Sequence, residues 1–527
     1  MIKKEYLLAG LITIFVLVFS NAYLLYGIMV PKDGMEFLGR RFINSQDTYT
    51  YIAFIEQARQ GKIFFENLYT SDPQTATLIR PSYAFLGGVA NVLGTSSAIA
   101  YHLGRIASTI LFCVVLYVFL GLFFKTPKKR LLAFAVTLFS SGVGYLTALV
   151  GVESSDLWIP ESITFLSLQE APHFIFSQTL MLLSFYFLFK AWSSKKMRYF
   201  FPTAAPLLFL GFEHPYNLFV CAGVAIIAGI YFMASHKIEK KQALIGIGSV
   251  LAGCVIGNSY QAFELYRNPI LKSWAFPSDS PIPAAYLLGY GLIVVFALIG
   301  IEKYLKEKHL PQVLILSWVA VSGVLLYAPV YFQRRLSEGL HIPLSILAAE
   351  GIIILSLFLG KFVIHRIRNT VVYTFACIIV VILSLGSLEG VYSDLGIISA
   401  DHQKDYYYYL LNQEMRAAHY IRDNSNSDDV ILSNWFYGNI LPGLTGRKVY
   451  VGHKAQTNNF DQKIEEVNKF LLNKDATTAY KFLNENKIKY IFVGKNDTVT
   501  SYGFKPAEKP YLEKVFDEGE AKVYKVK

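Results

Sequence analysis

Repeated apolar runs of about twenty residues dominate the chain, and they limit its fold more than any other feature. A bilayer core of about 30 Å is crossed by roughly 20 helical residues. The runs match that length, and 54% of the 527 residues are hydrophobic. The pattern therefore predicts a multi-span α-helical membrane protein.

The runs predict about eleven transmembrane helices. The first run follows only the short segment "MIKK" and is too long for the apolar core of a signal peptide, so we expect it to be retained. The expected spans lie at roughly 6–30, 98–124, 131–150, 173–191, 199–212, 216–234, 242–262, 284–301, 311–330, 341–360 and 371–390.

Two stretches leave alternatives open. The spans 199–212 and 216–234 are separated only by "EHP", so they form either two helices or one long tilted helix. The apolar segment 80–94 is too short to cross the bilayer. We expect a re-entrant or interfacial helix there.

The charges of the connectors fit this alternation of spans. Basic loops mark the cytoplasmic side of a membrane. We therefore expect a multi-pass protein of the cell membrane with a cytoplasmic N-terminus, and the net charge of +11 reflects this orientation rather than a nucleic-acid partner. Five basic connectors fall on the side of "MIKK": "KTPKKR" (125–130), "SSKKMR" (193–198), "HKIEKK" (236–241), "EKYLKEKH" (302–309) and "KFVIHRIR" (361–368).

Two long polar segments are then extracytoplasmic, namely a first outer loop at about 31–97 and residues 391–527. The second segment alternates helix-like and strand-like pieces, such as "DYYYYLLNQEMRAAHYIRD" (405–423) and "DVILS" (429–433). This alternation predicts a small α/β domain. The expected organisation is a transmembrane domain at 1–390 followed by this extracytoplasmic domain.

Arg334 and Arg335 stand just after an apolar span, on the expected outer side. A charge there is costly without an anionic partner or water, and the positive-inside rule disfavours arginine on that side. Interfacial snorkelling or an ion pair with Glu338 would explain the two arginines structurally. The planar guanidinium also suits phosphate oxygens, so we expect the pair to bind a phosphate.

Other ionisable residues lie at a comparable depth on the same side. Such groups at a membrane boundary are functional candidates, although each one alone also fits a helix cap or a satisfied interfacial group. Glu170, in the first turn of its expected helix, would also complement the helix dipole. The residues expected to bind or orient a substrate here are Glu170, His173, Glu213, His214 and Glu338.

A lone carboxylate, Asp47, opens the stretch "DTYTYIAFIEQARQGK" (47–62), which has the pattern of an amphipathic helix. Locally, Asp47 fits an N-terminal cap and Gly61 fits the stop. The local pattern alone favours this cap over the other role open to such a carboxylate, the base of an enzyme. Tyr51 in the same helix and Arg80 before the next apolar segment are further candidates for binding or orienting a substrate.

The layout resembles the GT-C class of polyprenyl-phosphate-dependent glycosyltransferases. The shared features are a long first outer loop with an acidic residue near its start, a proline-led apolar segment, many spans and an outer C-terminal α/β domain. The likeness is distant and extends to the protein mannosyltransferase, lipid A aminoarabinose transferase and oligosaccharyltransferase catalytic subunit families. "NWFYG" (434–438) is similar in place to the Trp-Trp-Asp-Tyr-Gly motif of the last family, but Phe436 replaces the aspartate, so transfer to asparagine is not expected.

The resemblance implies an inverting sugar transfer on the extracytoplasmic face, because an aspartate of the first outer loop is the base in that class and Asp47 matches it. The donor would be a polyprenyl-phosphate sugar, and the acceptor a lipid, a glycan or a protein. Arg334 and Arg335 would hold the donor phosphate, which requires them to share one cavity with Asp47.

A monophosphate donor would then need no metal. A pyrophosphate donor would favour magnesium or manganese, with Glu153, Asp156 or Glu170 as oxygen ligands. The alternative function is a lipid or solute transporter or flippase with an outward-facing polar cavity.

Overall fold

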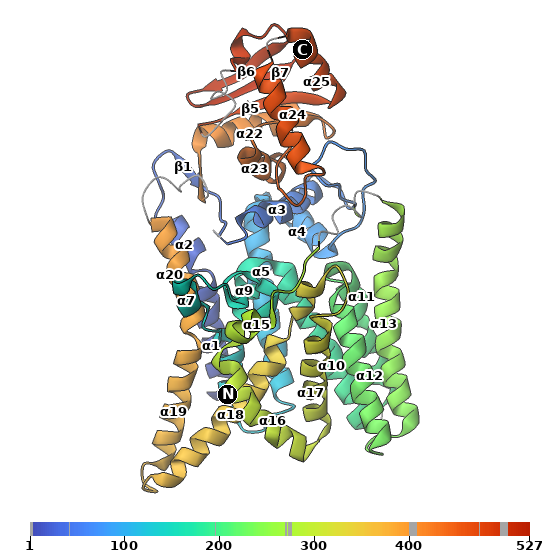
Figure 1. Ribbon diagram of the computed structural model, residues 1–527, viewed down its shortest axis with the longest axis vertical. Coiled ribbons are helices and arrows are strands. Elements are labelled where there is room, and N and C mark those ends of the chain that lie inside the picture. Colours follow the sequence, from blue (N-terminus) through green and yellow to red (C-terminus); the bar gives the residue numbers. More distant parts are fainter. Residues whose placement is uncertain are drawn as a thin grey trace. The chain divides into compact units, whose positions relative to one another are not determined.

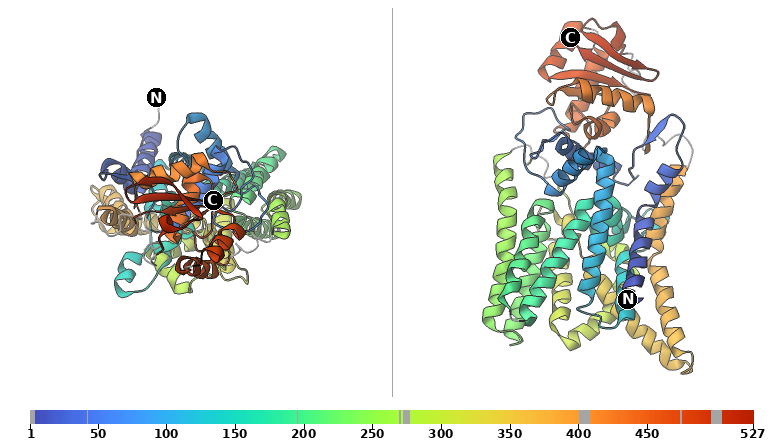
Figure 2. Two further views of the ribbon diagram at one scale, coloured as in Figure 1. Left: turned by 90° about the horizontal axis from the view of Figure 1, so that it is seen from above. Right: turned by 180° about the vertical axis from the view of Figure 1, so that it is seen from behind.

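The computed structural model describes residues 4–41, 43–194, 196–268, 271, 277–399, 408–473, 475–495 and 504–527. The chain forms two compact units, and Figures 1 and 2 colour it by sequence. Unit 1 comprises Met1–Ala22, Arg105–Phe263 and Pro277–Leu395, and unit 2 comprises Tyr23–Gly104, Glu264–Phe276 and Gly396–Lys527. Each unit therefore combines segments that are far apart in the sequence.

Long apolar helices make up about half of the chain, as its hydropathy predicts. Among the described residues, six helical stretches are long and apolar enough to cross a membrane, and up to nine if each bent pair of helices is one span. The six are Ser97–Leu120 (α5), Pro127–Val150 (α6, α7 and η1), Pro172–Ser194 (α10), Asn217–Ala234 (α12), Lys240–Arg267 (α13) and Gln333–Phe362 (η4, α18 and η5). The bent pairs are Lys4–Ser20 with Ala22–Met29 (α1 and α2), Pro283–Tyr290 with Leu292–Glu307 (α15 and α16), and Arg368–Leu383 with Leu385–Ser399 (α19 and α20).

The two other predicted spans, 199–212 and 311–330, form the shorter helices α11 (Phe200–Glu213) and α17 (Leu310–Leu325). Every predicted apolar run is therefore helical, because a chain in lipid must satisfy its backbone hydrogen bonds internally. The count of eleven crossings stays a prediction.

The stretch 199–234 folds as two helices rather than as one tilted helix. α11 ends before the turn at Pro215, and α12 follows it. α11 approaches α13 closely, since a Cβ on Gly211 would collide with the backbone of Gly257. Small residues allow such backbone contact between apolar helices.

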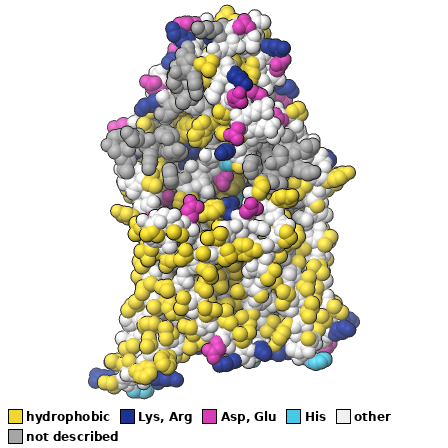
Figure 3. All heavy atoms as spheres, viewed as in Figure 1, with side chains coloured by type: hydrophobic (Ala, Val, Ile, Leu, Met, Phe, Trp, Pro, Cys, Tyr) yellow, Lys and Arg dark blue, Asp and Glu magenta, His cyan; other side chains and the backbone are white. Residues whose placement is uncertain are grey.

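Three of the five basic connectors lie at one end of the helices of unit 1. Figure 1 shows the α12–α13, α16–α17 and α18–α19 connections at that end. These connections contain the basic stretches 236–241, 302–309 and 361–368. On the face seen in Figure 3, the helices carry a broad band of hydrophobic side chains with Lys and Arg at its lower edge. This distribution fits the topology expected from the charges.

Unit 2 contains a mixed five-stranded sheet with the strand order β4-β3-β5-β7-β6. β3 pairs in parallel with β4 and β5, whereas β7 pairs in antiparallel with β5 and β6. Figures 1 and 2 show α22 along one side of this sheet. The strands are β3 (Val430–Leu432), β4 (Lys448–Val449), β5 (Ile488–Val493), β6 (Leu512–Glu518) and β7 (Ala521–Val526), and the helices are α22 (Asn412–Asn424), α23 (Trp435–Thr445), α24 (Phe460–Leu472) and α25 (Ala476–Glu485). The predicted small sheet domain is present.

One predicted helix of this unit, at 405–423, is wrong at its beginning. Tyr409–Leu411 form strand β2, which pairs in antiparallel with β1 (Met35–Phe37), and α22 begins only at Asn412. Residues 405–407 lie outside the described residues. Aromatic and branched side chains favour a strand when another strand is present to pair with.

The segment 31–97 contributes α3 (Ser45–Arg59) and α4 (Pro81–Leu93) to unit 2. The two helices pack closely, because Gly87 lies directly against Ala58. α4 leaves apolar side chains such as Phe85 exposed. This face suits an interfacial helix, and its position at a membrane stays a prediction.

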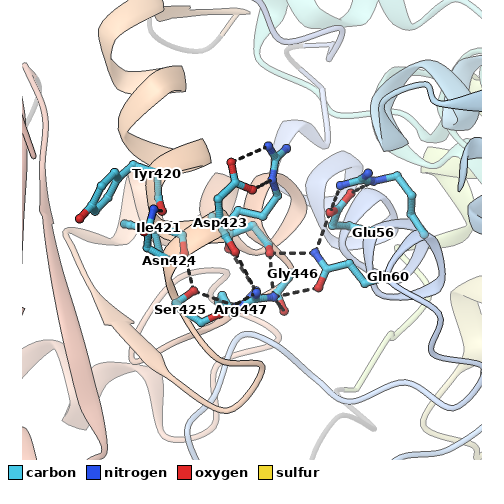
Figure 4. A network of polar contacts seen from close by, with 12 residues as sticks. Glu56, Gln60, Tyr420, Ile421, Asp423, Asn424, Ser425, Gly446 and Arg447 are labelled. Atoms are coloured by element: carbon cyan, nitrogen blue, oxygen red, sulfur yellow. Dashed lines mark hydrogen bonds and ion pairs between the residues drawn. The ribbon is translucent and has the colours of Figure 1, made fainter.

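Arg447 joins α3 to the C-terminal part of unit 2 (Figure 4). Its guanidinium donates to Gln60 Oε1 at 2.8 Å, to Ser425 Oγ at 2.9 Å and to the Arg422 carbonyl oxygen at 3.0 Å. Gln60 Nε2 in turn donates to the Thr445 carbonyl oxygen at 3.0 Å. Several hydrogen bonds from one buried cation fix geometry better than a single exposed ion pair. The helix that carries Asp47 is thereby held against the C-terminal segment.

Candidate functional site

Asp47 lies in the first turn of α3 and is not its N-terminal cap. The cap is Asn44, which adopts a left-handed conformation with φ of 53° and makes no side-chain capping hydrogen bond. The Asp47 backbone N–H donates to the Asn44 carbonyl oxygen at 3.0 Å. At the other end, Gly61 follows the helix with φ of +93°, as expected for a glycine stop. The capping interpretation of Asp47 is therefore wrong.

The Asp47 carboxylate is instead paired with His453. Oδ1 of Asp47 lies 2.9 Å from Nε2 of His453, although 406 positions separate the two residues. The imidazole is 7% exposed, whereas the carboxylate is 42% exposed. The Ala455 backbone N–H donates to Nδ1 of His453 at 3.0 Å. Because Nδ1 accepts, the neutral ring carries its hydrogen on Nε2 and donates it to Asp47.

Two further buried residues lie beside this pair. The ring of Tyr69 stands edge-on to the His453 ring, with centroids 6.0 Å apart, and its hydroxyl donates to the Asn439 carbonyl oxygen at 3.0 Å. Burial raises the pKa of Tyr69 far above its usual range, and the charge of Asp47 adds to this effect. The positive charge of Arg40 lowers the pKa of the same hydroxyl. The site thus combines the Asp47 carboxylate and the Arg40 guanidinium with the donors His453 and Tyr69.

Tyr51 and Arg80 lie together in unit 2. Tyr51 follows Asp47 by one helical turn on α3, so both occupy one side of the helix. The Arg80 guanidinium carbon lies 5.3 Å from the centroid of the Tyr51 ring. Arg80 caps α4 with a φ of 49°, a conformation that is costly for any residue except glycine. Such strain occurs where position matters more than local stability.

Arg334 and Arg335 lie in the short helix η4 (Gln333–Ser337) and not at the end of α17. Both are half-buried. The Arg334 guanidinium carbon stands 4.9 Å from the ring of Trp158, and that of Arg335 stands 5.2 Å from the ring of Tyr216. Stacking on an aromatic face orients the plane of a guanidinium. The arginine pair is thus presented by two aromatic residues of unit 1.

A second pair of imidazole and carboxylate is completely buried in unit 1. Nδ1 of His214 lies 2.5 Å from Oε2 of Glu338, and neither side chain is more than 1% exposed. The ring of His173 is 6.0 Å from that of His214, and the ring of Tyr216 is 5.2 Å from it. His173, His214 and Glu338, which were predicted from separate stretches, are therefore brought together next to Arg335.

Glu170 and Glu213 lie at helix ends close in sequence to these histidines. Glu213 is buried and is the last residue of α11, directly before His214. Glu170 is the last residue of α9 (Thr164–Glu170), and α10 begins after it at Pro172. Glu170 therefore stands just before the N-terminus of α10 rather than in the first turn of that helix.

Glu161, which was not predicted as a site residue, lies in η2 (Pro160–Ser162) in contact with η4. Its side chain is 2% exposed, and its Oε2 has no hydrogen-bond partner among the described residues. It interacts electrostatically with Glu338. The only sequence signal was its proximity to Trp158 and Pro160 in an outer loop.

The expected oxygen ligands for a metal do not form a group. Asp156 accepts hydrogen bonds from the Gly144 backbone N–H at 3.0 Å and from the Ser154 hydroxyl at 2.5 Å, which gives it a structural role. Within the described ranges, no three His, Cys, Asp or Glu side chains are arranged so that they could hold a metal ion.

Asp47 belongs to unit 2 and the arginine pair to unit 1. Their expected meeting in one cavity stays a prediction.

No protein-family model matches the sequence, and a search of curated proteins finds no match. Solved structures do match. The oligosaccharyltransferase AglB from Archaeoglobus fulgidus, in complex with an inhibitory peptide and a dolichol-phosphate, has a TM-score of 0.54 at 12% identity, covering 93% of this chain and 70% of that one. A structure of the Archaeoglobus fulgidus oligosaccharyltransferase with zinc and sulfate has a TM-score of 0.52 at 13% identity, covering 95% and 71%.

ArnT from Cupriavidus metallidurans, bound to undecaprenyl phosphate, has a TM-score of 0.55 at 10% identity, covering 99% of this chain and 98% of that one. These proteins are GT-C glycosyltransferases. The resemblance predicted from the layout of the sequence is thus confirmed as a similarity of fold.

Proposed function

We propose that this protein is a membrane glycosyltransferase that moves a sugar from a polyprenyl-phosphate carrier to an acceptor on the extracytoplasmic face. The observation that carries the proposal is the Asp47–His453 pair, in which a half-exposed carboxylate is aligned by a buried imidazole. The GT-C-like fold favours this function over a transporter. The acceptor is a lipid, a glycan or a protein.

In the proposed step, Asp47 takes the proton from an acceptor hydroxyl while the hydroxyl oxygen attacks the anomeric carbon of the donor sugar. The new bond from carbon to oxygen forms as the bond from that carbon to the phosphate oxygen breaks. The configuration at the carbon inverts, and the phosphate leaves on its lipid. Water then takes the proton from Asp47, whose exposure allows this exchange.

Arg334 and Arg335 would bind the departing phosphate. Two guanidinium groups offer paired donors and two positive charges to an oxyanion. Their stacking on Trp158 and Tyr216 preorganises them, so less entropy is lost on binding. Two arginines balance the charge of a monophosphate without a metal, which is why we propose a monophosphate donor. Magnesium or manganese would become relevant for a pyrophosphate.

The buried group of His173, His214 and Glu338 would orient the donor sugar. Imidazoles and carboxylates form hydrogen bonds with hydroxyl groups. Among the described residues, the buried atoms His214 Nε2 and Glu161 Oε2 have no hydrogen-bond partner, which is costly unless a ligand or water supplies one. On the acceptor side, Tyr51 and Arg80 would play the same orienting role, with Tyr51 one helical turn from the base.

The proposed topology has about eleven spans, a cytoplasmic N-terminus and an extracytoplasmic domain at 391–527. In this arrangement the basic loops contact the cytoplasmic leaflet, and the donor reaches the site through the membrane lipids.

Purified protein in lipid nanodiscs tests the proposal. We expect saturable binding of undecaprenyl phosphate and release of labelled sugar from at least one member of a panel of polyprenyl-phosphate sugars, with lipid extract as the acceptor. Protein that neither binds undecaprenyl phosphate nor consumes any donor of the panel would overturn the proposal.

A further inference from the structure

We infer that His453 is a positioning residue that acts as a fixed, neutral hydrogen-bond donor to the base Asp47. The inference rests on the proposed function and deepens it. It gives the C-terminal segment a part in the chemistry itself, since the segment supplies the side chain that aims the base.

The protonation state of His453 follows from its two neighbours. A backbone N–H can only donate, so Nδ1 must present a lone pair to Ala455 at 3.0 Å. The ring hydrogen therefore sits on Nε2, 2.9 Å from Oδ1 of Asp47. A second proton, on Nδ1, would point at the backbone N–H of Ala455, so that two donors would face each other. The geometry therefore arranges His453 as a donor to Asp47 rather than as the acceptor of the proton that Asp47 removes.

The backbone around His453 holds the ring in place. The Thr457 and Gln456 N–H groups donate to the His453 carbonyl oxygen at 2.8 and 3.0 Å, forming a tight turn. The Gly452 N–H donates to Thr457 Oγ1 at 3.1 Å. Added Cβ atoms on Gly438 and Gly452 would collide with the facing backbone, so α23 and this turn are in direct contact. The donor is therefore rigid before any substrate binds.

This arrangement fixes one carboxylate oxygen of Asp47 and favours its charged form, because a hydrogen bond to a carboxylate stabilises the anion. Tyr69, Arg40 and Lys454 are ionisable residues near the pair. Burial and the charge of Asp47 keep Tyr69 neutral, and the buried Arg40 is always charged. Lys454 is exposed to solvent.

The test compares His453→Ala, His453→Gln and the control His419→Gln, which changes a half-buried histidine of α22 in the same unit. We expect His453→Ala to lower kcat roughly 10-fold to 100-fold with unchanged binding of undecaprenyl phosphate. The acidic limb of its profile of kcat/KM against pH should move to higher pH, because the carboxylate loses a hydrogen bond that favoured its anion. His419→Gln should match the wild type.

His453→Gln separates a fixed donor from an acid or base. A glutamine amide can donate to Asp47 and accept from Ala455, yet it does not titrate. We expect it to restore most of the rate and the pH profile. If His453→Gln is folded, binds undecaprenyl phosphate and is as inactive as His453→Ala, the fixed-donor role is overturned.

An unchanged rate and pH profile in His453→Ala would also overturn the inference. If the alanine variant does not fold, the pH profile of the glutamine variant decides. Failure of the proposed function is distinguishable, because the wild type itself would then transfer no sugar.

Discussion

Asp47–His453 and Glu338–His214 are both pairs of imidazole and carboxylate, and their surroundings differ. In unit 2 the Asp47 carboxylate is 42% exposed, and its partner His453 is fixed by a backbone N–H. In unit 1 both Glu338 and His214 are buried, and Nε2 of His214 has no hydrogen-bond partner among the described residues. An exposed carboxylate can exchange protons with a substrate and with water. A buried pair cannot do so without a ligand.

This difference in exposure suits the two pairs to different tasks, proton transfer for one and ligand binding for the other. Asp47 is suited to take up a proton and release it, while its rigid partner only aims it. The buried pair is suited to bind polar ligand atoms. The buried Nε2 of His214 has no hydrogen-bond partner among the described residues, and this is costly until a ligand or water supplies one.

Asp47→Asn should lower the rate of sugar transfer roughly 1000-fold, because asparagine cannot accept the proton. Binding of undecaprenyl phosphate and the melting temperature should stay close to wild type, since the side chain is half-exposed. The measurement is transfer of labelled sugar beside a thermal shift. Asp33→Asn, an exposed change in the same loop, should have no effect. A folded, fully active Asp47→Asn would remove the base from the mechanism.

Glu338→Ala should destabilise the protein far more than Asp47→Asn does. Removing one member of a buried hydrogen-bonded pair leaves the partner unpaired, which typically costs about 1–3 kcal/mol and more for a charged partner. Thermal unfolding in detergent measures the difference, and Glu338→Gln should be milder because it retains the shape. Equal losses in Glu338→Ala and Asp47→Asn would break the contrast between the two pairs.

Arg334→Ala should weaken binding of undecaprenyl phosphate roughly tenfold to a hundredfold, equivalent to about 1.4–2.8 kcal/mol, with little change in the melting temperature. Arg334→Lys should recover only part of the affinity, because lysine lacks the planar fork. The matched control is Arg198→Ala, which removes an exposed arginine of unit 1. Unchanged affinity in Arg334→Ala would assign the arginine to packing on Trp158.

Asp72→Asn should lower stability by roughly 1–3 kcal/mol at neutral pH and leave transfer unchanged. Asp72 pairs with the buried Lys463 at 3.0 Å and accepts from Asn458 at 2.6 Å. Burial alone would raise the pKa of Asp72, but Asn458 and Lys463 outweigh it and the net shift is downward.

The sign of the pH dependence follows from this downward shift. The stabilisation by Asp72 is complete above the ordinary pKa of 3.8 and is lost as the pH falls through the lower folded value. Unfolding measured against pH should therefore show the gap between wild type and Asp72→Asn closing in acid. A gap that persists below that range would assign the stability to the shape of Asp72 rather than to its charge.

The sequence predicted the helices well because apolar runs long enough for a bilayer have few alternatives. It failed where long-range pairing decides. Tyr409–Leu411 form a strand because β1 lies beside them. The strand β6 was not predicted because charged residues occupy much of it.

The same limit applies to the candidate site. Asp47 stood out as a lone carboxylate, but a local pattern could not distinguish a cap from a base, and nothing near it pointed to His453. Glu161 was missed because its burial depends on η4, which is distant in the chain.

The 406 positions between Asp47 and its donor also bear on biosynthesis. A ribosome releases the first loop early, while the imidazole emerges only when most of the chain has been made. Until then the nascent protein would contain all of its membrane segments, but the Asp47 carboxylate would lack its hydrogen-bond donor. Catalytic competence would thus arrive as a late event of synthesis, after insertion into the bilayer is complete.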